Sequence, residues 1–235
     1  MTTVRHQEVN DFFSNWQVYQ AVLETNSMEH RQIYAGVARI LDERTEPFSL
    51  LDLGCGDATA IAPLLPDRPL QRYVGVDCTA PVLELARHTL APLGDRARFE
   101  VGDLLEYLET TAERFDLILV SFALHHLADP AHKRRFLEVA HQHLNPGGEL
   151  ILVDVARRDG ESRADYVQRF GQEVLPTWPL PPAVQERILA HVRDNDWPEE
   201  ADTQPAWGLE LGYTAVVPFF VGVQETERGW RFQRG

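Results

Sequence analysis

The feature that most constrains the fold is an alternation of short apolar segments with helical patterns through the middle of the chain. Between Phe48 and Val155, apolar runs such as FSLLDLG and FDLILVS alternate with segments whose apolar residues recur every three or four positions. The apolar runs are continuous, which is typical of parallel strands that are covered on both faces. The pattern therefore predicts a doubly wound α/β domain with helices on both sides of a mostly parallel sheet.

The expected elements follow one another in strict alternation. Strands are expected at 48–54, 71–77, 97–103, 115–121 and 149–155, and helices at 57–66, 80–94, 104–110 and 130–144. Thr79 is the expected N-cap of the second of these helices, which has Pro81 in its first turn. Each helix therefore leads from one strand to the next.

The two ends of the chain follow different patterns from this core. Helical periodicity runs from about Asp11 to Glu43, with a break near ETNSMEH. After Asp154 two helices are expected within 161–196, interrupted by PTWPLPP, and then a helix and two strands. A chain of 235 residues fits one domain. Its expected parts are a helical cap (1–47), a core (48–155), a helical insertion (156–213) and a closing hairpin (214–235).

Composition excludes several classes of partner. With 36 acidic against 22 basic residues and a net charge of −14, the chain offers little surface for binding a phosphate backbone, so nucleic acid is not expected as a partner. No secretion signal is expected from the N-terminal residues, and FDLILVSFALHHL is shorter than the roughly 20 residues that span a bilayer. A cytoplasmic protein without a membrane partner is expected. Cys55 and Cys78 form neither a CxxC motif nor a disulfide framework.

A turn containing two glycines follows the first expected strand, in LLDLGCGDATA. Ligands of doubly wound sheets bind at the carboxyl ends of the strands, and glycine lets the backbone approach a ligand. Glycines 54 and 56 also fit plain packing. A dinucleotide site would have a third glycine where Thr59 stands, and Asp52 and Asp57 make the turn acidic, which disfavours a pyrophosphate. The turn therefore favours a ligand end that carries positive charge.

Two further acids end the next two strands. Asp77 lies 21 positions after Gly56, the spacing at which an acid accepts hydrogen bonds from ribose hydroxyls. Asp77 would alternatively cap the following helix, although Thr79 is better placed for this. Asp103 ends the third strand in the same way and could accept from an adenine amino group, with Leu104 against the ring.

Five segments in this order, LLDLGCGDA, GVD, EVGDL, FDLILVSFALHHL and LNPGGELILVD, resemble the class I S-adenosylmethionine-dependent methyltransferases of the small-molecule type. The resemblance covers about 48–155. It implies a Rossmann-like sheet of seven strands, the last antiparallel, and S-adenosylmethionine as the cofactor, with S-adenosylhomocysteine as the product. The implied cofactor contacts are Asp52, Gly54 and Gly56 at the methionyl end, Asp77 at the ribose, Asp103 and Leu104 at adenine, and Ser121 and Phe122 at the floor of the pocket. Cys55 and Cys78, which lie beside these residues in the chain, are also expected to bind the cofactor.

The resemblance places His125 and His126 where methyl donor and acceptor meet. An imidazole is a reasonable general base near neutral pH, and His125 is the first choice. Alternatively, one histidine orients the loop and the other is partly buried. No metal is expected on His125, His126 and His132, because no acid or cysteine lies at ligand spacing.

The acceptor site is expected to come from the flanking segments. Tyr19, Met28 and His30 would reach inward from the helical cap. The tryptophans of the insertion, Trp178, Trp197 and Trp207, would complete the acceptor pocket or form the insertion's own core.

The predicted function is methyl transfer to an O, N, S or C nucleophile of a small molecule. An NAD(P)-dependent oxidoreductase would need a third glycine and a Tyr/Lys pair, whereas Lys133 is the single lysine. A non-catalytic partner subunit would not need the acids at 52, 77 and 103. A methyltransferase acting on RNA or protein would show a basic groove or an Asn/Asp-Pro-Pro-Tyr motif where SFALHH stands. The acceptor and the oligomeric state are not predicted by the sequence.

Overall fold

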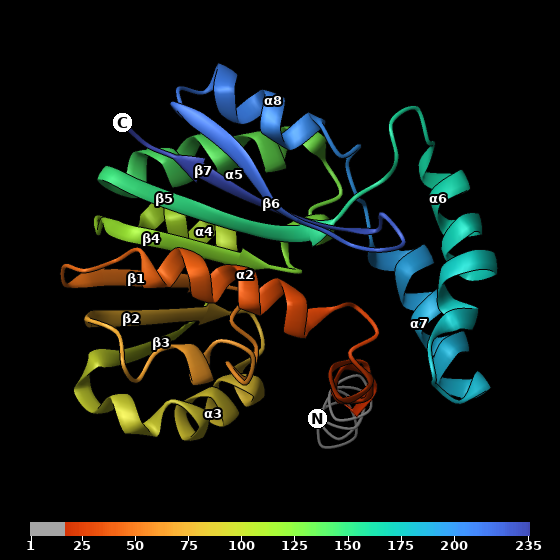
Figure 1. Cartoon of the computed structure of the whole chain (residues 1–235), viewed down its shortest axis with the longest axis horizontal. Coiled ribbons are helices and arrows are strands. Elements are labelled where there is room, and N and C mark those ends of the chain that lie inside the picture. The colour runs from red at the N-terminus through yellow and green to blue at the C-terminus, as the bar shows by residue number, and fades with distance from the viewer. Residues whose placement is uncertain (1–16) are drawn as a thin grey trace, which may run out of the picture.

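The computed structural model describes residues 17–235, within which seven strands form one sheet flanked by helices (Figure 1). The strands are β1 (Phe48–Leu53), β2 (Leu70–Asp77), β3 (Ala97–Val101), β4 (Phe115–Ser121), β5 (Leu144–Val155), β6 (Ala215–Val221) and β7 (Glu227–Gln233). Their order is β3-β2-β1-β4-β5-β7-β6. Strand β7 pairs antiparallel with β5 and β6, and the other neighbouring strands pair parallel. The expected seven-stranded, mostly parallel Rossmann-like fold is confirmed.

Helices cover both faces of this sheet. They are α2 (His30–Asp42), α3 (Ala80–Thr89), α4 (Leu104–Thr110), α5 (Pro130–His143), α6 (Arg163–Arg169), α7 (Pro182–Asn195) and α8 (Thr203–Glu210). Shorter turns are η1 (Ala62–Leu64), η2 (Ala91–Arg96), η3 (Leu124–His126), the π-helical η4 (Phe170–Val174) and η5 (Leu175–Thr177). Another helical segment covers residues 17–25, whereas the helical prediction for residues 11–16 lies outside the described part. Within residues 17–235, no helix combines the length and apolarity needed to cross a bilayer.

The alternation of helices and strands produces two cores, one on each face of the sheet. Leu50 of β1 and Leu119 of β4 pack with α2 and α3 on one face. Leu51 and Val120, which follow them by one position, pack with α4 and α5 on the other. Successive side chains of a strand point to opposite faces, so apolar residues at consecutive positions are buried on both.

The segment after β1 differs from the expected helix at 57–66, because only the short turn η1 forms there. Asp57 Oδ1 accepts a hydrogen bond from Thr59 N at 3.0 Å, and Ala58 has a φ of +58°. A side chain that binds the nearby backbone competes with helix formation, and a residue with positive φ interrupts it. The expected helix is therefore wrong.

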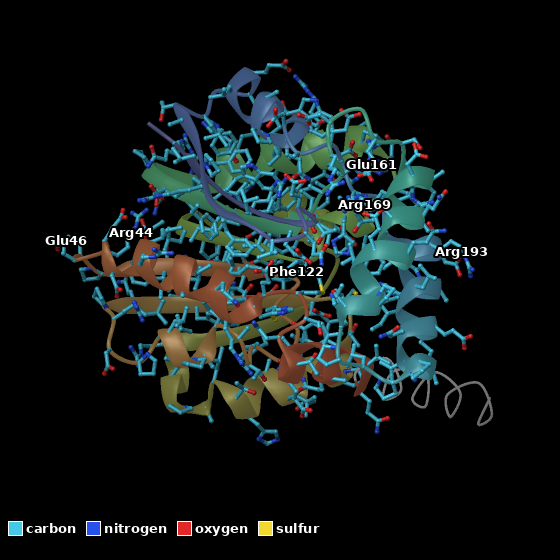
Figure 2. All side chains as sticks on the ribbon, turned by 45° about the vertical axis from the view of Figure 1, so that its right-hand side comes forward. Arg44, Glu46, Phe122, Glu161, Arg169 and Arg193 are labelled. Atoms are coloured by element: carbon cyan, nitrogen blue, oxygen red, sulfur yellow. The ribbon has the colours of Figure 1, made fainter. Side chains whose placement is uncertain are left out.

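The inserted helices stand across the carboxyl ends of β1, β4 and β5 (Figure 1). Side chains of α6, η4 and α7 pack with Val22 of the 17–25 helix in a third apolar cluster. Figure 2 shows Glu161 and Arg169 beside one another at α6. Two hydrogen bonds join them, at 2.6 and 2.9 Å, and both side chains are largely buried. The pair fixes α6 to the loop after β5, so the insertion covers the edge of the sheet where strand order reverses.

Candidate functional site

The turn after β1 is built around two glycines with positive φ, +71° at Gly54 and +54° at Gly56. The backbone N–H groups of Gly54 and Cys55 both donate to Val76 O, at 2.8 and 3.1 Å. A Cβ on Gly54 would lie 2.5 Å from Ala123 Cβ, whereas a Cβ on Gly56 would meet nothing within 4 Å. Packing therefore requires glycine at 54, and the absence of a side chain at 56 leaves the turn open to a ligand.

A pocket of about 120 Å³ lies against this turn. Cofactor residues predicted from the sequence line it together: Asp52, Gly54, Cys55, Gly56, Ser121 and Phe122. Asp52 is buried, and its Oδ2 accepts a hydrogen bond from Tyr73 Oη at 2.8 Å. Burial raises the pKa of Asp52 to about 7, because the surroundings disfavour the charged carboxylate. A cationic group bound here would stabilise the ionised form.

Asp57 makes this pocket more acidic and connects it to the N-terminal helix. The Asp57 side chain is buried and accepts from Gln20 Nε2 at 2.8 Å. Sequence analysis did not identify Gln20. Two buried acids beside the glycine turn fit a positively charged ligand end better than a pyrophosphate.

Asp77 joins the glycine turn to the start of α3. Its Oδ2 accepts from Gly56 N at 3.1 Å and its Oδ1 from Thr79 N at 2.8 Å. Thr79 is the N-cap residue, but its hydroxyl makes no capping hydrogen bond. A carboxylate has about four acceptor sites, so these two contacts leave capacity for a diol. Cys78, next in the chain, is exposed.

Asp103 and Leu104 lie apart from the pocket. Asp103 is exposed and caps α4, because its Oδ1 accepts from Leu105 N at 2.8 Å and Glu106 N at 3.1 Å. Leu104 packs against the core beneath α4 and α5. Neither residue lines the two cavities at the glycine turn. Their contact with adenine stays a prediction.

A second cavity, of about 700 Å³, adjoins the small pocket, and Tyr19, Gly56 and Phe122 line both. Figure 2 shows Phe122 between the sheet and the inserted helices. Phe122 has a φ of +53°, a backbone strain of the kind that gathers at functional sites. The ring of His30 lies 5.0 Å from that of Phe122 and 6.0 Å from that of Tyr19. Met28 lines the same cavity.

His30 is buried without any hydrogen-bond partner for either ring nitrogen. Burial lowers the pKa of His30 to about 4, so the ring is neutral at physiological pH. Of the three residues predicted to form the lid, Tyr19 and Met28 line the cavity, whereas His30 packs against Tyr19 and Phe122 and does not line it. Their roles stay predictions.

Of the three tryptophans, only Trp178 lines the larger cavity. The Trp197 ring lies under the guanidinium of Arg163, 3.8 Å from its centroid. Trp207 packs against the core of the sheet. The expectation that all three complete the acceptor pocket is therefore wrong for Trp197 and Trp207.

The histidine pair forms part of the wall of the larger cavity, in η3 directly after β4. His125 is buried, and its Nδ1 lies 2.5 Å from Asp154 Oδ1. Burial acts to lower the pKa of His125, but the carboxylates of Asp154 and Asp196 outweigh it, and the pKa is raised. His126 is more exposed. Desolvation and the neighbouring His125 lower the pKa of His126 to about 4.

Sequence analysis missed both carboxylates at His125. Asp154 stands fully buried inside the apolar strand LILVDV, and a charge in such a strand was an available signal. Asp196 lies 71 positions after His125 and carried no local signal. The fold brings it there because Trp197 N donates to His125 O at 2.9 Å. Thus an acid accompanies the histidines in space although none does in the sequence.

Comparisons with known proteins place this arrangement in a family. Residues 51–150 match the family model of a methyltransferase domain. An uncharacterised methyltransferase of Geobacillus kaustophilus is 33% identical over 159 residues, which cover 66% of this chain and 71% of that protein. A ribosomal RNA small subunit methyltransferase C of Actinobacillus pleuropneumoniae is 35% identical over 106 residues, but the match covers only 31% of its length.

The fold agrees with this assignment. The N-methyltransferase NodS of Bradyrhizobium japonicum, solved with S-adenosylhomocysteine, superimposes with a TM-score of 0.59 at 20% identity, over 89% of this chain and 87% of that protein. The sequence match, the sheet order and the glycine turn at the end of β1 agree. This chain belongs to the class I S-adenosylmethionine-dependent methyltransferases.

Proposed function

We propose that this chain transfers a methyl group from S-adenosylmethionine to a small-molecule acceptor and releases S-adenosylhomocysteine. The observation that carries this proposal is that two adjoining cavities are both lined by Tyr19, Gly56 and Phe122. One cavity lies at the family's glycine turn, and the other extends from it under the inserted helices. The proposed parts of the chain are a helical cap (1–47), a cofactor-binding core (48–155), a helical insertion (156–213) and a closing hairpin (214–235).

The residues at the glycine turn fit the cofactor. Buried Asp52 and Asp57 would pair with the ammonium of its methionyl end, and Asp77 would accept from the ribose hydroxyls. The open space at Gly56 admits the ligand beside the backbone. When bound, the cofactor supplies a methyl group on a positively charged sulfur, which is activated for displacement.

A small molecule suits the larger cavity better than RNA does. About 700 Å³ is within the usual range of roughly 300–1,000 Å³ for small-molecule sites. Its walls include aromatic and aliphatic side chains such as Phe170, Trp178 and Ile188. The net charge of −14 opposes binding to a phosphate backbone. We therefore infer an acceptor with a substantial apolar part, and a cytoplasmic location stays a prediction from the sequence.

The chain's own contribution to the reaction is to hold the acceptor and exclude water. Orienting two reactants for in-line attack can supply about 7–11 kcal/mol of the barrier. The inserted helices and the 17–25 helix cover the cavity, and we propose that His125 and His126 face the reacting group of the acceptor. Because Nδ1 of His125 is hydrogen-bonded to Asp154, Nε2 is the ring nitrogen that is left to contact an acceptor in the cavity.

Calorimetric titration tests the donor half of this proposal. Purified protein is titrated with S-adenosylmethionine, S-adenosylhomocysteine and NAD. We expect micromolar binding of both sulfur compounds and none of NAD. Binding of NAD alone would favour the oxidoreductase alternative, and failure to bind either sulfur compound would favour a non-catalytic subunit.

Replacing Asp77 with Ala is expected to weaken S-adenosylmethionine binding by about 1.5–3 kcal/mol, the range for hydrogen bonds that involve a charged group. Two effects contribute, because Asp77 also accepts from Gly56 N and so holds the turn. Asp77→Asn is the matched variant, since it retains an oxygen acceptor and the size of the side chain. Calorimetry on both should give an intermediate loss for Asn. Wild-type affinity in the Ala variant would refute the ribose assignment.

A further inference from the structure

Two imidazoles and one carboxylate converge in the wall of the larger cavity. His125 and His126 lie in η3, and Asp196 follows α7, so the fold joins three side chains that are distant in sequence. One ligand atom from each residue lies within 4.8 Å of the other two. We propose that His125, His126 and Asp196 bind a divalent transition-metal ion of the Zn²⁺ type.

The distances from Asp196 to the two histidines fit a shared ion better than direct hydrogen bonds. Asp196 Oδ1 lies 3.6 Å from His125 Nε2 and 3.7 Å from His126 Nδ1. Both distances exceed a normal hydrogen bond. Two ligands at about 2.0–2.2 Å from a tetrahedral ion lie roughly 3.3–3.6 Å apart. Imidazole nitrogen and carboxylate oxygen are also ligands that zinc accepts. His126 Nδ1 also lies 3.3 Å from Asn195 O, and a bound ion would replace that contact.

The carboxylate of Asp196 gives an independent indication of a missing partner. Asp196 is only 5% exposed, yet its Oδ1 is buried without a hydrogen-bond partner. A buried charged oxygen is costly unless it is paired or coordinates a metal. His191 Nε2, at the exposed rim, lies 3.3 Å from the same oxygen. We assign His125, His126 and Asp196 as the ligands, because each of these three residues has a ligand atom within 4.8 Å of the other two.

The groups around the cluster hold it in the arrangement that metal sites use. Asp154 Oδ1 lies 2.5 Å from His125 Nδ1, which leaves Nε2 as the ligating nitrogen. Histidine ligands of metals nearly always donate their other N–H to such an acceptor. The backbone beside Asp196 is fixed as well, because Trp197 N donates to His125 O at 2.9 Å and Arg163 Nε donates to Asp196 O at 2.7 Å. His125 and Asp196 are therefore held in place before an ion binds.

A buried lysine also holds the backbone segment that follows Asp196. Lys133 is fully buried, and its Nζ donates to Trp197 O and, at 2.7 Å, to Glu199 Oε1. The solitary lysine of the chain thus positions the segment that carries Asp196.

The role of the ion rests on the proposed function, whereas its binding does not. Three protein ligands leave one position for another group, as in catalytic zinc sites. All three residues line the acceptor cavity, so an acceptor oxygen or nitrogen can take that position. A bound cation lowers the pKa of a coordinated hydroxyl, so that the hydroxyl releases its proton to water and the nucleophile is available near neutral pH. The ion would then replace His125 as the means of deprotonation, because the lone pair of Nε2 cannot serve both.

Metal titration tests this site directly. Untagged protein is stripped with EDTA and titrated with Zn²⁺ in competition with a chromophoric chelator, and Co²⁺ absorption is recorded in parallel. We expect one equivalent to bind and a Co²⁺ spectrum that Zn²⁺ abolishes. His126→Ala and the isosteric Asp196→Asn should each weaken binding at least about tenfold. His132→Ala, an exposed histidine outside the cluster, is the matched control and should bind like the wild type.

Two results would overturn the proposal. One is the lack of stoichiometric Zn²⁺ binding by folded wild-type protein, which would leave His125 as an imidazolium between two carboxylates. The other is equal binding by wild type, His126→Ala and Asp196→Asn. Titration of the same metal-free samples with S-adenosylmethionine reports on the proposed function separately. Thermal melts of each variant show that a loss of metal is not a loss of fold.

Discussion

Replacing Gly54 with Ala is expected to abolish measurable S-adenosylmethionine binding and to reduce the free energy of unfolding by about 2–5 kcal/mol. Two costs add. The φ of +71° is strained for any residue with a Cβ, and that Cβ would lie 2.5 Å from Ala123 Cβ. Relief of the clash must move the turn or the start of η3, and both border the cofactor pocket. Urea denaturation and calorimetry measure the two losses.

Gly147→Ala is the matched control. Gly147 has nearly the same φ, +72°, but a Cβ there would meet nothing within 4 Å. Only backbone strain of about 1–2 kcal/mol is then expected, with cofactor affinity unchanged. Equal losses in the two variants would show that contact with Ala123 does not hold the turn in place.

Replacing Asp52 with Asn is expected to have opposite effects on stability and on cofactor binding. The pKa of Asp52 is raised by burial from 3.8 to about 7, so its ionisation destabilises the folded protein as pH rises through 7. At pH 8 the neutral Asn variant should therefore be more stable, by up to about 4 kcal/mol. Asn keeps an acceptor for Tyr73 Oη. Cofactor affinity should fall at least about tenfold, because the carboxylate that would pair with the ammonium is lost.

The same carboxyl predicts the pH dependence of cofactor binding. Pairing with an ammonium requires ionised Asp52, and the ionised fraction falls as pH decreases below about 7. Wild-type affinity for S-adenosylmethionine should decrease about 25-fold from pH 7.5 to 5.5, and that of Asp52→Asn should stay nearly constant. Calorimetry across this range measures both. A flat wild-type profile would contradict the pairing of Asp52 with the cofactor.

Much of the sheet could be predicted because its strands carry their burial in the sequence. FDLILVS is apolar at consecutive positions since β4 is covered on both faces. The periodicity of apolar residues could not show that the helix expected at 57–66 is absent. The helix is prevented by the hydrogen bond from Thr59 N to the Asp57 side chain and by the positive φ of Ala58. Local apolar patterns therefore predict buried strands well, but they do not reveal the side-chain hydrogen bonds that shape a turn.

The candidate site likewise contains residues that local sequence predicts and residues that only the fold brings together. The glycine turn is local in sequence and was found, whereas Asp196 reaches His125 only through the packing of the insertion against η3. Asp103 shows the opposite case. Its position after a strand predicted a ligand contact, yet the carboxylate caps α4. A residue that follows a strand and precedes a helix can take either role.

The measurement that tests the central claim most directly is the destination of the methyl group. Protein is incubated with methyl-labelled S-adenosylmethionine and a cell extract, which is then separated into small-molecule, RNA and protein fractions. We predict label in the small-molecule fraction, formed by wild type and strongly reduced in Gly54→Ala. Label that appears in RNA or protein and not in small molecules would contradict the assignment of the 700 Å³ cavity as the acceptor site.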